Sequence, residues 1–110
     1  MVVGVSEIRV ERGGNVAYRA FARVGEILAP TVAAIRGACV GAGVNLALAP
    51  DLRTVADDAR IVAGFLRLGI HPGGGDFSLL GRSGGREFAA AIGLFAEEIN
   101  GRRAVELGLA

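Results

Sequence analysis

The chain has 110 residues, of which 52% are hydrophobic, 5% are aromatic and 18 are glycines. This length suits one compact domain and leaves no room for a two-domain enzyme. Because 12 basic residues are interspersed with 11 acidic ones, for a net charge of +1, we expect no basic face for binding nucleic acid.

The predicted elements alternate between helix and strand. Helical spacing of Ala17, Phe21, Val24 and Leu28 predicts an amphipathic helix that Pro30 stops. Short apolar runs predict strands, and glycine, proline and paired aspartates predict turns. In chain order we expect a strand at 31–35, a glycine turn at 41–43, a helix at 44–49 closed by Pro50, and strands at 52–56 and 60–63.

The second half begins with a glycine-rich loop over residues 68–75, and Asp76 follows as the expected N-cap of a helix. Helical spacing then extends through Phe88, Ala91, Ile92 and Phe95. A last short helix at 102–107 ends at Gly108. The alternation predicts an α/β fold in one unit over residues 1–110.

Composition excludes several kinds of chemistry and location. All 12 basic residues are arginine, so neither a P-loop lysine nor a Schiff-base lysine exists. One cysteine, Cys39, and one histidine, His71, do not make a clustered metal site, so we expect no metal. Cys39 cannot form an internal disulfide, which favours a cytoplasmic protein. The start lacks a secretory signal, and the apolar stretch at 37–50 is too short to cross a membrane.

The turn Gly41-Ala42-Gly43 is the first candidate site. Because it precedes a predicted helix, its backbone N–H groups would point outward at the positive end of the helix dipole, where they suit an anion or an oxyanion. From the glycines alone, a plain packing turn between strand and helix is the simpler interpretation, and the glycines do not decide between the two. A dinucleotide fingerprint fails because Leu46 stands at the third glycine position. A serine hydrolase fails because no Gly-x-Ser-x-Gly occurs.

The residues around this turn resemble the crotonase family, also called the enoyl-CoA hydratase/isomerase family. The resemblance covers residues from about 18 to 110 and includes Ala59. It rests on the segments Pro30-Thr31-Val32-Ala33-Ala34-Ile35-Arg36-Gly37, Gly41-Ala42-Gly43-Val44-Asn45-Leu46-Ala47-Leu48-Ala49-Pro50-Asp51, Leu68-Gly69-Ile70, Pro72-Gly73-Gly74-Gly75 and Gly101-Arg102-Arg103-Ala104-Val105-Glu106-Leu107-Gly108-Leu109.

The resemblance implies a spiral of β-β-α units that acts on acyl-CoA thioesters and assembles as a trimer or hexamer. It implies no metal or redox cofactor, since coenzyme A is part of the substrate. In such enzymes two backbone N–H groups hold the thioester oxygen, and one of them falls on Ala42, flanked by Gly41 and Gly43. The other comes from an earlier segment, which nothing in Met1 to Asn15 resembles.

The chain departs from the family at both catalytic carboxylates, where Asn45 and Phe65 stand. Neither side chain exchanges a proton near neutral pH. Asn45 would orient water or the thioester, or is simply a satisfied amide, and Phe65 would line an acyl pocket or pack in the core. His71 and Asp76 are then the candidates for proton transfer, although a solvated histidine and a helix cap are the plainer interpretations.

These observations predict a partial crotonase-like domain of acyl-CoA metabolism. The leading hypothesis is an enoyl-CoA hydratase/isomerase-like protein that polarises the thioester at the Gly41–Gly43 turn. The alternative is a non-catalytic acyl-CoA-binding or assembly subunit, or an inactive fragment, because both carboxylate positions are changed. The chain also stops where the family continues into C-terminal helices, which favours a fragment or a truncated product.

Overall fold

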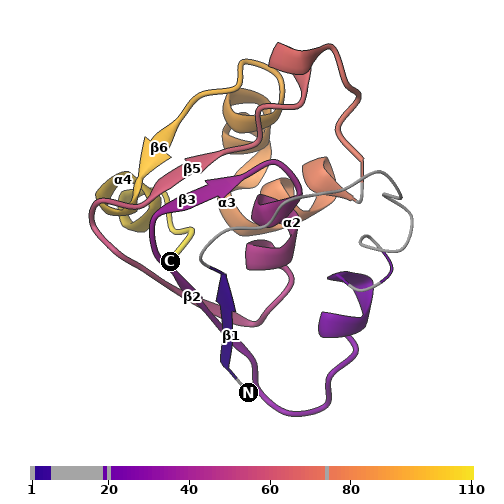
Figure 1. Ribbon diagram of the computed structural model, residues 1–110, viewed down its shortest axis with the longest axis vertical. Helices are drawn as coiled ribbons and strands as arrows, with labels where there is room; N and C mark the ends of the chain where they lie inside the picture. Colours follow the sequence, from indigo (N-terminus) through magenta and orange to yellow (C-terminus); the bar gives the residue numbers. More distant parts are fainter. Residues whose placement is uncertain (1, 6–18, 20, 74) are drawn as a thin grey trace.

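The computed structural model describes residues 2–5, 19, 21–73 and 75–110, with the backbone alone for 2–5. The described strands form two three-stranded sheets (Figure 1). The first sheet is parallel and has the order β1 (Val2–Val5), β2 (Val32–Ile35), β4 (Leu52–Val55). The second has the order β3 (Ala38–Val40), β5 (Arg60–Val62), β6 (Ile99–Asn100), in which only β6 runs antiparallel.

The strands and helices form successive β-β-α units. β2 and β3 lead into α2 (Ala42–Leu48), and β4 and β5 lead through the short 3-10 helix η1 (Leu66–Leu68) into α3 (Asp76–Gly93). In each unit the first strand joins one sheet and the second strand joins the other. The second unit therefore stacks on the first, with Ala33 opposite Arg53 and Cys39 opposite Ile61. This arrangement confirms the predicted partial spiral of β-β-α units.

One continuous core fills the space between the sheets and helices. Along β2 the burial alternates, so that Ala33 and Ile35 face inward, as a pleated strand requires. Small residues such as Ala33, Ala59 and Ala63 line the core and let α2 approach closely. Every α2 residue except Leu46 is buried, and α2 contacts β1, β2, β3 and α3. A helix buried on nearly all sides must find partners for its polar groups.

Several boundaries differ from the sequence-based predictions by one or two residues, as helix ends commonly do. The helix predicted at 44–49 begins earlier, at Ala42, and the one predicted at 102–107 is α4 (Gly101–Glu106). The strands β3 and β6 were not predicted, because runs of two or three residues carry no detectable period. Gly108 follows α4 with a φ of 75°, as its predicted role required.

Three predictions about individual residues are wrong. Gly75, not Asp76, is the N-cap of α3, and Asp76 is the first helical residue. Phe95 is 81% exposed because α3 ends at Gly93. Leu28 is fully exposed because the helical turn of residues 21–24 ends well before it, although Phe21 is buried as expected. Ala17, on the same predicted face, lies outside the described residues.

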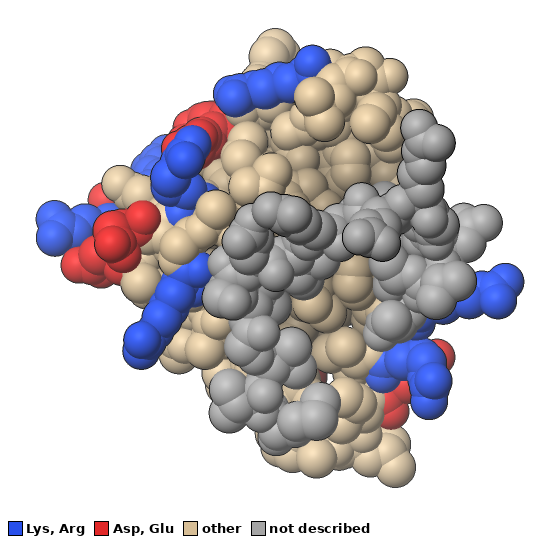
Figure 2. Space-filling model, in the orientation of Figure 1, with Lys and Arg blue, Asp and Glu red and all other residues tan. Residues whose placement is uncertain are grey.

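The charged side chains seen in Figure 2 lie at the edges of the molecule, with basic and acidic groups side by side. Three exposed ion pairs are formed among the described residues: Arg60 with Glu98, Arg102 with Asp57, and Arg103 with Glu106. Among the helices of the described part, none has both the length and the apolar character that a membrane span requires.

Candidate functional site

The Gly41 turn connects β3 to α2 and has a backbone that only glycine adopts readily, with φ 58° and ψ −122°. Its N–H donates to the carbonyl oxygen of Val62 at 2.9 Å, and its own carbonyl accepts from the N–H of Val44 at 2.9 Å. The turn is thereby tied to β5. The N–H groups of Ala42 and Gly43 open the first turn of α2, where no preceding helical carbonyl exists to accept them. They are the donors that an oxyanion would use.

Asn45 lies one helical turn after Ala42 and is fully buried. Because helical side chains lean toward the N-terminus, its amide lies over the first turn of α2. Its Nδ2 donates to the carbonyl oxygen of Gly73 at 3.0 Å. That bond orients the amide and leaves Oδ1 as the buried acceptor without a partner among the described residues. Asn45 is thus only half satisfied, and its free oxygen is available to a ligand or a water.

Asp76 is the first residue of α3 and is 1% exposed. Neither of its carboxylate oxygens has a hydrogen-bond partner among the described residues. A position at a helix N-terminus favours the charged form. Burial has the opposite effect and dominates, raising the pKa of Asp76 from 3.8 to about 6. A carboxyl group with this pKa can both accept and release a proton near neutral pH.

The carbonyl oxygen of Gly73 brings these two residues together. It accepts from Nδ2 of Asn45 at 3.0 Å and from the backbone N–H of Asp76 at 3.2 Å. Two buried polar side chains with three unpartnered oxygens therefore share one anchor where α2 meets α3. Buried polar groups normally have partners, and groups without one are frequently found at functional sites.

Phe65 lies beside the same turn. A β-carbon at Gly41 would stand 3.9 Å from the Phe65 ring and 3.6 Å from the carbonyl oxygen of Ala63. The Phe65 side chain is half-buried and packs against the core. It therefore shows features of both interpretations, the core residue and the apolar wall next to the turn.

His71 is placed differently from the other candidates. Its side chain is exposed, in the loop between η1 and α3. The structure thus links Asn45 and Asp76 through the Gly73 carbonyl and places Phe65 beside Gly41, whereas His71 faces solvent. The two candidates for proton transfer therefore differ in environment, since Asp76 is buried and His71 is exposed.

One functional feature was missed by the sequence analysis, namely the Gly73 carbonyl as the common anchor. The only sequence signal was the glycine run itself, which lets the loop backbone turn toward α2. Cys39 is buried as predicted, and burial raises the pKa of its thiol to about 12, so it stays protonated. In the described part of the chain, no group of three His, Cys, Asp or Glu side chains is placed to hold a metal ion.

The chain matches the family described as enoyl-CoA hydratase/isomerase over residues 13–110. A probable enoyl-CoA hydratase, EchA14, of Mycobacterium tuberculosis is 45% identical over 93 residues, which cover 84% of this chain and 36% of that protein. The fatty acid oxidation complex subunit alpha of Shewanella frigidimarina is 40% identical over 91 residues, covering 81% of this chain and 13% of that subunit.

Solved structures show the same likeness in three dimensions. The enoyl-CoA hydratase from Bacillus anthracis superposes with a TM-score of 0.83 and 30% identity, covering 87% of this chain and 37% of that one. The enoyl-CoA hydratase from Polaromonas sp. JS666 gives a TM-score of 0.80 and 32% identity, covering 87% and 37%. The chain spans about a third of the length of the hydratases that it matches.

Proposed function

This chain belongs to the enoyl-CoA hydratase/isomerase family, and on that premise we propose that it binds an acyl-CoA thioester and acts on the acyl carbons next to the carbonyl. The thioester oxygen accepts a hydrogen bond from the N–H of Ala42. The observation that carries the proposal is that Asn45 and Asp76 are both buried and both have oxygens without a hydrogen-bond partner among the described residues. Asn45 lies one turn after Ala42 in α2, and Asp76 is the first residue of α3.

The role of Ala42 depends on its backbone alone. As negative charge develops on the thioester oxygen, a fixed N–H at the start of α2 stabilises that charge without reorganising. The polarised carbonyl makes the α-carbon acidic and the β-carbon of an enoyl group electrophilic. No particular side chain is needed at this step, which fits the small residues of the turn.

Asp76 is the proton-transfer group of the proposal. In hydration, the oxygen of a water bonds to the β-carbon, one of its protons leaves, and a proton is added to the α-carbon. In isomerisation, a proton leaves one carbon of the chain and returns to another two carbons away. With a pKa of about 6, Asp76 serves as acceptor or donor in either case, and the free Oδ1 of Asn45 holds the water by accepting its hydrogen.

The test replaces Asp76 with Asn and measures turnover of crotonyl-CoA. We expect a loss of about 10²-fold or more, since positioned acid–base groups contribute 10²–10⁴-fold. His71→Gln is the matched control and should keep the wild-type rate. A wild-type rate in Asp76→Asn, or a collapse in His71→Gln, would contradict the assignment.

The oxyanion role has a separate test. Ala42→Pro removes the N–H at the first helical position, where proline is sterically tolerated. We expect the variant to fold and to bind crotonyl-CoA no better than free coenzyme A in calorimetric titration. Unchanged preference for the thioester would exclude Ala42 as the donor.

A second candidate function is a non-catalytic acyl-CoA binder or assembly subunit. The replacement of both family carboxylates by Asn45 and Phe65 favours it. Crotonyl-CoA binding that is tighter than coenzyme A binding, without turnover, would select this candidate. Absence of both binding and turnover in a folded chain would select an inactive fragment.

We further propose that the working form is a homo-oligomer, a trimer or hexamer, in the cytoplasm. Support for assembly comes from large apolar side chains at the surface, including Leu68 at 76% exposure and Phe95 at 81%. Support for the compartment comes from cysteine usage, since a single buried thiol suits a reducing environment.

A further inference from the structure

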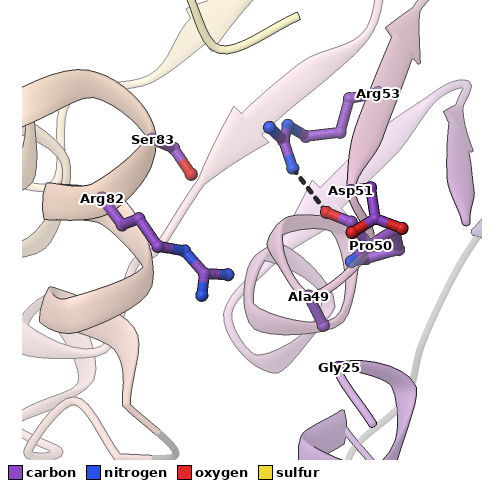
Figure 3. A pocket seen from close by; sticks show the side chains of 7 residues that line it. All are labelled: Gly25, Ala49, Pro50, Asp51, Arg53, Arg82 and Ser83. Carbon is purple, nitrogen blue, oxygen red and sulfur yellow. Dashed lines mark hydrogen bonds between the residues drawn. The ribbon is translucent and has the colours of Figure 1, made fainter. Parts of the chain in front are cut away.

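A hollow of about 360 Å³ lies at the end of α2 opposite the Gly41 turn. Figure 3 shows Arg82 extending from α3 toward the Ala49–Pro50 turn, with Ser83 beside it and Arg53 reaching in from β4. Its full lining is Gly25, Ala49, Pro50, Asp51, Arg53, Arg82 and Ser83. Two of these seven residues are arginines.

Arg53 is held rigidly. Its Nε donates to the carbonyl oxygen of Leu109 at 2.6 Å, and its Nη1 donates to that of Pro50 at 3.0 Å. Burial lowers the pKa of Arg53, and the positive charge of Arg82 lowers it further. The two positive charges therefore repel each other, and this repulsion costs free energy unless an anion binds between them.

Asp51 offsets part of this positive charge: hydrogen bonds from Thr31 lower the pKa of its carboxyl group, and the positive charge of Arg82 lowers it further. Its Oδ2 accepts from both the backbone N–H and the hydroxyl of Thr31, each at 2.8 Å. Arg82 makes no ion pair with it, nor with any other acidic side chain of the described residues. The hollow thus has two guanidinium groups, one carboxylate already engaged elsewhere, and a net charge of +1.

A second hollow of about 300 Å³ adjoins the first and shares Gly25, Ala49 and Arg82 with it. Its other lining residues include Phe21, Ala22 and Leu79, so it is mainly apolar. Arg82 stands between the two hollows. A ligand that fits both has an anionic end and an apolar stem.

We propose that these hollows bind a carboxylate with a short apolar stem, its carboxylate hydrogen-bonded to Arg82 and Ser83 and its stem lying against Ala22 and Leu79. A guanidinium matches the two oxygens of a carboxylate, and a single negative charge balances the lining. The first hollow lies about 10 Å from the Gly41 turn, at the other end of the seven-residue α2. The second hollow is lined by Gly75 and Leu79, which flank Asp76 in the sequence.

The test titrates the chain with sodium hexanoate, sodium acetate and inorganic phosphate, following backbone amide resonances. We expect saturable shifts at Ala22, Leu79 and Ser83 with hexanoate, weaker effects with acetate because it lacks the stem, and none that saturate with phosphate. Arg82→Gln should weaken hexanoate binding at least 10-fold. Arg86→Gln, on α3 beyond the Gly85 kink and outside both hollows, is the control and should bind as wild type.

Three outcomes would overturn the proposal. Phosphate binding as tightly as hexanoate would show general anion attraction in place of a carboxylate site. Equal affinity in Arg82→Gln and Arg86→Gln would remove Arg82 from the site. Shifts at the same residues on dilution, with no ligand present, would show that a second copy of the chain already fills the hollow.

Discussion

Asp76 shows how two local effects compete within one side chain. The start of α3 stabilises negative charge, whereas removal from water destabilises it. The raised pKa indicates that removal from water is the larger effect. The carboxyl group therefore costs stability in its charged form, which is common for groups retained for chemistry.

This cost predicts a pH dependence of stability. Because the pKa rises from 3.8 to about 6 on folding, the folded state binds the proton more tightly, and stability falls as pH increases through this window. Asp76→Asn removes the effect. Relative to wild type, we expect the variant to gain about 2–3 kcal/mol in free energy of unfolding between about pH 4 and pH 8, by urea denaturation. Parallel pH profiles for the two proteins would contradict the prediction.

At the scale of elements, close backbone contact fixes the position of α4. The N–H of Gly101 donates to the carbonyl oxygen of Asp57 at 3.2 Å, and a β-carbon at Gly101 would overlap the backbone carbonyl of Ala56. Only a glycine allows α4 to begin so near the end of β4. Asn100 then caps the helix by accepting from the N–H of Arg103.

Two glycine-to-alanine substitutions test this contact. We expect Gly101→Ala to lower the free energy of unfolding by about 2–4 kcal/mol, since the backbones must separate. Gly81→Ala, in α3, meets nothing within 4 Å and should raise it by about 0.5–1 kcal/mol, because alanine restricts the unfolded chain. Urea denaturation of both variants is the measurement. Equal effects at the two positions would refute a special contact at Gly101.

At the scale of the whole molecule, several large apolar side chains are exposed on two segments that a hydrogen bond joins. Leu66, Leu68 and Ile70 around η1 are exposed, as are Leu94 and Phe95 after α3. These two segments are tied together, because Arg67 donates from Nη2 to the carbonyl oxygen of Ala96 at 2.6 Å. Exposed apolar side chains on neighbouring segments are typical of contacts between subunits.

Substitutions on this surface test the proposed assembly. Leu68→Ser combined with Phe95→Ser should lower the molar mass measured by light scattering at a given concentration, with little loss of stability because both side chains are exposed. The control is Val105→Ser, which should keep the wild-type mass. Val105 is exposed on α4, far in the sequence from Leu68. The same mass for all three proteins would place the interface elsewhere.

The fold class, the order of most elements and the family could all be predicted from the sequence. Each of these depends on local signals, such as apolar runs, glycines that permit unusual backbone angles, and the segments from Pro30 to Asp51. The family resemblance also identified the Gly41–Gly43 turn and the changed positions Asn45 and Phe65. Short strands such as β6 carried no such signal, because their pairing partners lie elsewhere in the chain.

Which candidate residues lie close together depends on the packing of the folded chain. The sequence predicts both Asp76 and His71 as candidates for proton transfer, yet Asp76 is buried and shares the Gly73 carbonyl with Asn45, whereas His71 is exposed. That outcome depends on the loop that brings the Gly73 carbonyl to both α2 and α3. The hollow between Arg53 and Arg82 likewise joins residues 29 positions apart. Burial and proximity arise from packing between distant segments, which no local pattern in a sequence encodes.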